Sequence, residues 1–197
     1  MLELKEIILD HQREGLLQPT SLIAREGAVS TLTGQKESGK TWLLKAIMGL
    51  APYERGYISI DGEVITPLSA SFYRERMAYV PQLSPSVPMT VGELLKTIWG
   101  LHINDDKDFH RTDIRKRWQQ LDLDSTLWDA DSSQLPAPTL RRILLSVTPL
   151  LDRAIVLADM PFLGQDTTHS LLVENYLQQM AAEGRVVIVT KRPDDDR

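Results

Sequence analysis

Two uninterrupted apolar runs near the end of the chain predict buried parallel strands. Residues 154–158 read Ala-Ile-Val-Leu-Ala, and residues 186–189 read Val-Val-Ile-Val. A strand that is apolar at every position is typical of a parallel sheet covered on both faces, because none of its side chains meets water. Between the two runs, residues 168–182 carry apolar side chains at helical spacing and end before Gly184, which predicts a connecting helix.

The N-terminal part of the chain has the patterns of three further strands. Residues 2–9 mix charged and apolar side chains and predict an edge strand, and residues 16–23 predict a second strand. Residues 28–32 predict a short third strand that leads into a glycine-containing loop. Beyond this loop the apolar spacing becomes helical, with one face formed by Leu43, Ile47 and Leu50.

A hairpin and a helical region follow. Residues 57–60 predict a strand that ends at Asp61-Gly62, a dipeptide typical of tight hairpin turns. Residues 77–80 predict another short strand. Residues 90–127 have helical patterns, and we expect a small helical subdomain there, packed by Trp99, Trp118 and Trp128.

The loop between the third strand and its helix carries the clearest chemical signal. Residues 34–41 read Gly-Gln-Lys-Glu-Ser-Gly-Lys-Thr, which fills the P-loop pattern of a glycine, four residues and Gly-Lys-Ser/Thr. In such a loop the backbone N–H groups hold phosphates, the lysine reaches the β- and γ-phosphates, and the hydroxyl can hold Mg²⁺. The sequence therefore predicts nucleotide binding by Gly34, Gln35, Lys36, Glu37, Ser38, Gly39, Lys40, Thr41 and Trp42.

Composition narrows the classes of function. The chain of 197 residues has a net charge of -5, which gives no global basic field for nucleic acid, and we expect no nucleic-acid partner. It has no cysteine, which excludes disulfides, thiolate catalysis and cysteine zinc sites. No apolar run approaches the roughly 18 residues of a membrane span, and the N-terminus lacks a signal-peptide core. We therefore expect a cytoplasmic protein that reaches the inner face of a membrane only through a partner.

The order of these segments, over nearly the whole chain, resembles the ATP-binding cassette (ABC) family of ATPase subunits. Residues 39–50 resemble the family's P-loop helix, and residues 56–62 resemble its hairpin segment. Tyr79-Val-Pro-Gln82 is similar to the Q-loop, and Thr90-Val-Gly-Glu-Leu-Leu95 to the opening of the helical subdomain. Residues 155–166 resemble the Walker B segment followed by the D-loop.

Strands alternating with helices predict an α/β fold. With the resemblance, we expect a P-loop NTPase core with a mostly parallel sheet, an N-terminal antiparallel β part and a small inserted helical subdomain. Residues 1–197 would form a single ABC-type nucleotide-binding domain. In it, residues 1–82 and 140–197 would form the P-loop core and residues 83–139 the helical subdomain.

The resemblance also implies ligands and roles. The loop would bind ATP, and Mg²⁺ would be held by Thr41, Gln82 and Asp159, which offer the oxygen ligands that this ion prefers. Gln82 would also connect the site to a membrane partner. Taken from the residues alone, Asp159 can also be an ordinary strand-end carboxylate, and Gln82 a surface amide.

Three departures from the family pattern predict weak or absent hydrolysis and no catalytic residue. Met160 replaces the glutamate that polarises water, and a general base typically contributes about 10²–10⁴-fold. Lys191 replaces the switch histidine; it keeps a charge for a γ-phosphate or is simply a solvated lysine. The signature Leu-Ser-Gly-Gly-Gln is replaced by Leu135-Pro136-Ala137-Pro138-Thr139, in which Pro136 lacks the hydroxyl and Pro138 the N–H for a partner's nucleotide.

Two further positions concern the nucleotide itself. Trp42 stands where the family usually has a small hydroxylated residue, so its indole either crowds the α-phosphate or packs away from it. The adenine-stacking aromatic residue of the N-terminal loop is missing, and His11 is the nearest candidate.

The leading hypothesis is an ATP-binding subunit of an ABC-type transport system, in which MgATP acts as a structural or switching ligand. A membrane-spanning subunit, a second ATPase subunit, or both would be its partners. A dimer is possible, and the two prolines argue against a symmetric one. The alternatives are a slow ATPase whose base comes from Asp166 or a partner, and a soluble regulatory P-loop protein outside transport.

Overall fold

The computed structural model describes residues 1–9, 19–83 and 88–193, which contain two four-stranded sheets. The first sheet has the order β2-β1-β4-β5, and its neighbours pair antiparallel. The second has the order β3-β8-β7-β6, and its neighbours pair parallel. The antiparallel strands are β1 (Leu2–Leu9), β2 (Thr20–Ala24), β4 (Tyr53–Ile60) and β5 (Glu63–Val64). The parallel strands are β3 (Val29–Thr33), β6 (Met77–Val80), β7 (Ile155–Ala158) and β8 (Val186–Lys191).

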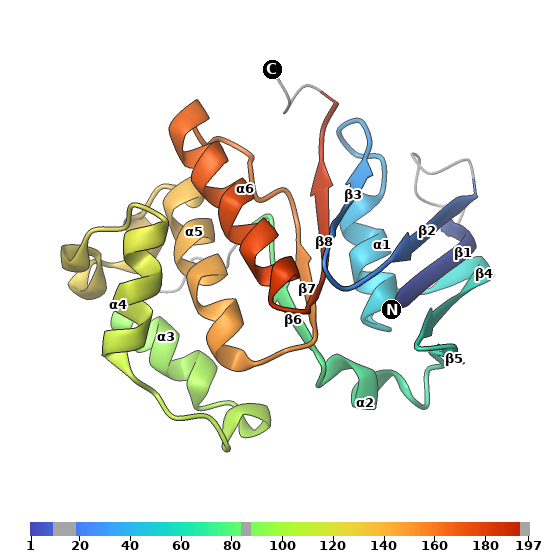
Figure 1. Cartoon of the computed structure of the whole chain (residues 1–197), viewed down its shortest axis with the longest axis horizontal. Coiled ribbons are helices and arrows are strands. Elements are labelled where there is room, and N and C mark those ends of the chain that lie inside the picture. The colour runs from blue at the N-terminus through green and yellow to red at the C-terminus, as the bar shows by residue number, and fades with distance from the viewer. Residues whose placement is uncertain (10–18, 84–87, 194–197) are drawn as a thin grey trace.

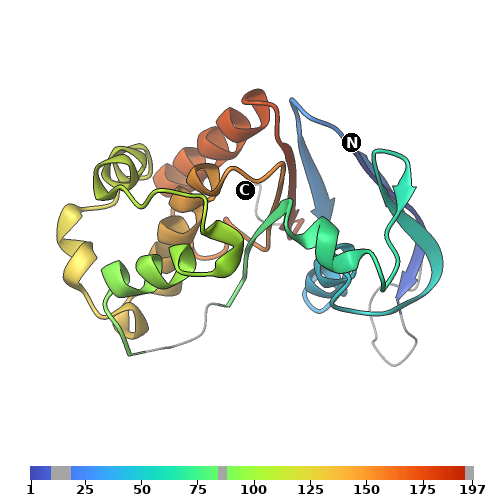
Figure 2. The ribbon, with the colours of Figure 1, turned by 90° about the horizontal axis from the view of Figure 1, so that it is seen from below.

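Helices cover both faces of the parallel sheet. Helix α1 lies between the two sheets, whereas α3 to α6 gather on the opposite side (Figures 1 and 2). The α-helices are α1 (Lys40–Ile47), α2 (Ala70–Arg74), α3 (Val91–Trp99), α4 (Arg111–Gln120), α5 (Ala137–Val147) and α6 (Thr167–Ala182). Short 3₁₀ helices are η1 (His102–Asn104), η2 (Ser125–Asp129), η3 (Ser132–Gln134) and η4 (Thr148–Leu151). In the described part of the chain, no helix has both the length and the apolar character to cross a membrane.

The two apolar runs of the sequence are the central strands β7 and β8. Alternate side chains of each strand point to opposite faces, because the side-chain period of a strand is two. Ile155, Leu157, Val186 and Ile188 belong to the apolar cluster around α1 and the antiparallel sheet. Their neighbours Val156, Ala158, Val187 and Val189 belong to the cluster under α5 and α6. Both faces are thus covered, as the absence of polar positions predicted.

The helical region packs through its tryptophans, as the sequence predicted. Trp99, Trp118 and Trp128 are all buried, and the rings of Trp118 and Trp128 lie 5.9 Å apart. Helix α3 begins with a capping box, in which Thr90 and Glu93 satisfy each other's backbone N–H groups. The fold class predicted from the sequence is confirmed: a parallel sheet, an antiparallel β part near the N-terminus, and added helices.

One strand assignment was wrong. Residues 2–9 were expected at an edge, but β1 lies inside its sheet, between β2 and β4. The alternation of apolar side chains shows which face of a strand is buried, and it carries no information about the neighbours on either side. The predicted strand 16–23 is observed as Thr20–Ala24, with residues 16–18 outside the described part. The hairpin at Asp61-Gly62 is confirmed as the turn between β4 and β5.

The parallel sheet explains where the site lies. Strands β3, β6, β7 and β8 run in the same direction, so their carboxyl ends meet at one edge. Open α/β sheets bind their ligands outside this edge. The segments that follow the four strands are residues 34–39, Gln82, Asp159 and Arg192, and the site is built from them.

Candidate nucleotide-binding site

The loop of residues 34–39 turns from β3 into α1 without a side-chain cap on the helix. Gly39 stands at the N-cap with φ 81° and ψ 6°, a left-handed conformation that costs a glycine no steric penalty. Gly34 donates its N–H to the Lys191 carbonyl at 3.2 Å, which ties the start of the loop to β8. The first backbone N–H groups of a helix have no partner within the helix, which makes a helix N-terminus a favourable place for an anion.

Lys40 points back into the curve of this loop. Its side-chain Nζ donates to the carbonyls of Gly34 at 2.5 Å and Gln35 at 2.6 Å, and to Ser38 Oγ at 3.0 Å. The residue is only 9% exposed, so a positive charge lies at the centre of the loop. Gly34 and Gln35, both predicted site residues, thus hold the lysine through their main chain.

Asp159 lies next to Thr41, which is 118 positions away in sequence. The Thr41 hydroxyl donates to Asp159 Oδ2 at 2.6 Å, and the Thr190 hydroxyl donates to Oδ1 at 2.6 Å. The Tyr79 hydroxyl, at 3.3 Å from Oδ2, is a third donor. Burial, followed by the negative charge of Asp159, raises the pKa of Tyr79, so its phenol stays a donor. The carboxylate itself is fully buried.

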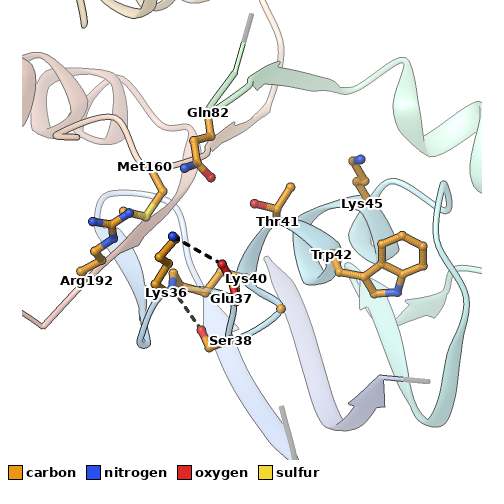
Figure 3. A pocket seen from close by; sticks show the side chains of 11 residues that line it. Lys36, Glu37, Ser38, Lys40, Thr41, Trp42, Lys45, Gln82, Met160 and Arg192 are labelled. Atoms are coloured by element: carbon orange, nitrogen blue, oxygen red, sulfur yellow. Dashed lines mark hydrogen bonds and ion pairs between the residues drawn. The ribbon is translucent and has the colours of Figure 1, made fainter. Parts of the chain in front are cut away.

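A hollow of about 420 Å³ opens above these groups, within the usual size range of small-molecule sites. Figure 3 shows Met160 and Arg192 on one side of it, Trp42 and Lys45 on the other, and Gln82 above Thr41. The lining residues are Lys36, Glu37, Ser38, Gly39, Lys40, Thr41, Trp42, Lys45, Gln82, Met160 and Arg192. The structure thus brings the predicted loop residues together with Gln82, and Asp159 lies behind Thr41.

Met160 lines the hollow at the position where a general base would stand. It is 3% exposed, and its backbone has φ 52°, an uncommon value for a residue other than glycine. Its N–H donates to Thr190 Oγ1 at 2.8 Å, so the threonine that bonds Asp159 also fixes this turn. Among the described lining residues, Glu37 alone offers a carboxylate, and that side chain is 83% exposed beside Lys36.

The cation at the end of β8 that faces this hollow is Arg192. Lys191, at the expected switch position, lines a different hollow together with Glu174 and Gln178 of α6. The cause is the two-residue period of the strand, which turns Lys191 to the same face as Val187 and Val189. Thr190 and Arg192 therefore face the loop, which the motif alignment alone did not indicate.

Trp42 packs toward the antiparallel side of the site and away from Lys40 (Figure 3). Its indole Nε1–H donates to the Pro52 carbonyl at 3.1 Å, and the half-buried ring packs against the apolar cluster around α1. The indole is thus directed away from Lys40, and its relation to an α-phosphate stays a prediction. His11, the expected base-stacking candidate, lies outside the described residues.

Arg141 is a site residue that the motifs did not reveal. Its buried guanidinium donates through Nε to the Gln82 carbonyl at 3.2 Å, through Nη1 to the Met160 carbonyl at 3.3 Å, and to the Leu163 carbonyl. Burial lowers the pKa of Arg141. The sequence feature that could have revealed Arg141 is the pair of arginines at residues 141–142 within an apolar helical segment. A charged side chain at a buried helix position requires polar partners.

The two prolines and Asp166 lie outside the hollow. Pro136 is the N-cap of α5, Pro138 stands in its first turn, and Gln165 Nε2 donates to the Pro138 carbonyl at 2.9 Å. Asp166 caps α6: it accepts from the His169 N–H at 2.8 Å and lies 2.6 Å from a ring nitrogen of the same histidine. Both oxygens of this carboxylate are therefore engaged by His169.

Comparison with known proteins decides the family. A sequence model of the ABC transporter family matches residues 17–163. The chain belongs to the ABC transporter family. It is 24% identical to the manganese transport system ATP-binding protein MntB of Listeria monocytogenes, over 95% of this chain and 78% of MntB. It is 25% identical to the zinc transport system ATP-binding protein TroB of Treponema pallidum, over 95% of this chain and 70% of TroB.

Solved structures of the ABC transporter family share the fold. A putative ABC transporter ATP-binding protein from Pyrococcus furiosus has a TM-score of 0.80 at 20% identity, over 98% of this chain and 92% of that one. A dimeric post-hydrolysis structure of the ATP-binding cassette MJ0796, bound to ADP and Pi, has a TM-score of 0.76 at 20% identity, over 100% and 89%. The resemblance to ABC ATP-binding subunits predicted from the sequence is confirmed.

Proposed function

We propose that this chain binds MgATP in the hollow above residues 34–41, as the ATP-binding subunit of an ABC-type transport system, and that it hydrolyses ATP slowly or not at all. The observation that carries the binding proposal is the 2.6 Å contact between the Thr41 hydroxyl and the Asp159 carboxylate, beside the buried ammonium of Lys40. A phosphate-binding loop, a cation and a carboxylate within one hollow are the parts that nucleoside triphosphate binding requires.

The loop sets the direction of the bound triphosphate. Its lysine serves the β- and γ-phosphates, and the helix that follows begins near the α-phosphate. The γ-phosphate would then point to the side of Met160 and Arg192, and the base to the side of Trp42 and Lys45 (Figure 3). Both sides line the hollow, which gives the ligand room at each end.

The donor set fits a magnesium ion. Thr41 offers a hydroxyl oxygen, Asp159 a carboxylate and Gln82 an amide oxygen, which are hard ligands of the kind that Mg²⁺ prefers. Thr41 and Asp159 already lie in contact, and Gln82 faces the same hollow. When bound, the ion would neutralise phosphate charge, while Thr190 and Tyr79 keep the carboxylate oriented.

Weak hydrolysis is proposed because Met160 stands where the resemblance expects the base, and the carboxylate that Glu37 offers among the described lining residues is 83% exposed beside Lys36. The Met160 thioether accepts no proton, and the Asp166 carboxylate caps α6 and contacts His169. A general base raises the rate of the chemical step by about 10²–10⁴-fold. Without one, bound ATP would mostly dissociate unchanged instead of being hydrolysed. Binding alone can still shift a conformational equilibrium.

Partner subunits would complete the proposed transport system. The relatives MntB and TroB carry the names of ATP-binding proteins of transport systems, which supports a membrane-spanning partner. The proposed place of contact is the cytoplasmic face of the membrane. The MJ0796 cassette is dimeric, which supports a second ATPase subunit. Pro136 and Pro138 at the start of α5 favour a partner with an intact signature over a second copy of this chain, because proline offers neither a hydroxyl nor an N–H.

The proposal is tested by two measurements on the purified chain. Titration calorimetry with ATP and Mg²⁺ is expected to give saturable binding, and a phosphate-release assay is expected to give turnover at least 100-fold below that of a family member with an intact base. Asp166→Asn is expected to leave the residual rate unchanged. A rate typical of intact members would contradict the hydrolysis part, and absence of binding would contradict the whole proposal.

Arg192, and not Lys191, is expected to contact the γ-phosphate. Arg192→Gln should weaken ATP binding about fivefold, as expected for a partly exposed ion pair, and leave ADP binding unchanged. Lys191→Gln is the matched control, since Lys191 lines the other hollow, and it should change neither affinity. The two variants are compared by calorimetry, and equal effects of both would refute the assignment.

A further inference from the structure

We infer that Trp42 is the base-stacking residue of this site. The inference rests on the proposed binding of a nucleotide to residues 34–41 and names the part of the site that selects the base. Among the described residues that line the hollow, Trp42 is the aromatic one.

The position of the indole follows from the helix. The Thr41 side chain points toward Asp159, and Trp42 is the next residue of α1. Successive residues are rotated by about 100° about the helix axis, so the Trp42 side chain points in a different direction from that of Thr41. Lys45 follows three residues later on the same face and also lines the hollow. This is the side opposite Met160 and Arg192 (Figure 3), where the base would lie if the γ-phosphate points to Arg192.

The indole is held in place before any ligand arrives. Its N–H is bonded to the Pro52 carbonyl at 3.1 Å, and part of the ring packs against the apolar cluster around α1. The remainder lines the hollow. A ring that is bonded at its polar edge and partly packed keeps one orientation, so a flat ligand that stacks on the part lining the hollow would bind without further loss of side-chain freedom.

Stacking on an aromatic ring needs a π-face and no particular hydrogen-bond pattern. The ligand class selected by Trp42 is therefore a nucleotide with any large planar base, and adenine and guanine nucleotides should bind with similar affinity. The phosphates would supply most of the binding free energy through the loop, and the base a smaller, separable part.

The test compares ATP with inorganic tripolyphosphate, which carries the phosphates without a base. Trp42→Ala is expected to weaken ATP binding about tenfold and to leave tripolyphosphate binding unchanged, as measured by titration calorimetry with Mg²⁺ present. Trp42→Phe keeps a π-face and should retain most of the ATP affinity. Urea denaturation of each variant shows that the fold is kept.

Three results would overturn the inference. Tighter binding of both ligands to Trp42→Ala would mean that the indole obstructs the loop. Equal weakening of both would mean that it only supports the loop, and unchanged ATP binding would mean that the base lies elsewhere. Failure of the wild type to bind tripolyphosphate or ATP is a different outcome, because it would overturn the proposed function itself.

Discussion

Replacing Lys40 with alanine is expected to weaken ATP binding about 100-fold. Hydrogen bonds to a charged partner contribute about 1.5–3 kcal/mol, and Lys40 lies where it can meet two phosphates. The upper part of this range corresponds to about two orders of magnitude in affinity. Because the ammonium is largely buried at the centre of the loop, solvent screens it less than a surface lysine.

The same substitution separates charge from loop geometry. Lys40 also bonds the carbonyls of Gly34 and Gln35, so alanine removes internal contacts together with the charge. Lys40→Arg keeps the charge, and we expect it to lose less affinity than alanine. Lys96→Ala, an exposed lysine of α3, is the control and should bind ATP like the wild type. Calorimetric affinities within threefold of the wild type for Lys40→Ala would contradict the proposed site.

Replacing Asp159 with alanine is expected to lower the free energy of unfolding by about 3–5 kcal/mol. The hydroxyls of Thr41, Thr190 and Tyr79 all donate to this one carboxylate, and alanine leaves them without it. A buried polar group that loses its partner costs about 1–3 kcal/mol. Thr190 also accepts the Met160 N–H, so the turn that forms one side of the hollow should loosen as well.

Urea denaturation measures this effect. Asp159→Asn keeps one oxygen acceptor and most of the volume, and we expect it to lose about half as much stability as alanine. Asp108→Ala removes a carboxylate that is 92% exposed and should change stability by less than about 0.5 kcal/mol. An unfolding free energy for Asp159→Ala within that margin of the wild type would show that the three hydroxyls find other partners.

The asparagine variant also tests the metal. If Asp159 holds Mg²⁺, the ion should raise the ATP affinity of Asp159→Asn less than that of the wild type, because the carboxylate charge is gone and only neutral oxygen ligands remain. The wild type should bind ATP more tightly in excess Mg²⁺ than in EDTA. A wild type that binds ATP equally under both conditions would remove Asp159 from the set of metal ligands.

Sequence patterns predicted the elements that depend on local order. The apolar runs of β7 and β8 identified parallel strands covered on both faces, and Asp61-Gly62 identified a hairpin turn. Both features depend on the types of residues that are adjacent in the sequence. The nine predicted nucleotide-binding residues, 34–42, are adjacent in the chain, so they lie close together whatever the tertiary fold. The division of the chain into a core and the helical subdomain 83–139 stays a prediction.

Only the tertiary structure decided which distant side chains meet. Arg141 joins three carbonyls from two loops, Thr190 bonds both Asp159 and Met160, and Arg192 rather than Lys191 faces the hollow. These contacts depend on strand order and on the face to which each side chain turns. A sequence motif specifies neither the strand order nor the face of each side chain. A shift of one residue in strand register moves every side chain of the strand to the opposite face of the sheet.

The sequence by itself thus determined that this chain has a phosphate-binding loop, a carboxylate at the end of a buried strand and no glutamate after it. The structure decided that the carboxylate reaches the loop threonine, that Trp42 lies beside the phosphate-binding loop, and which cation completes the hollow. Residue type fixes what chemistry is available. Packing fixes which groups come within reach of one another, since parallel strands bring their ends to one edge only after the sheet has formed.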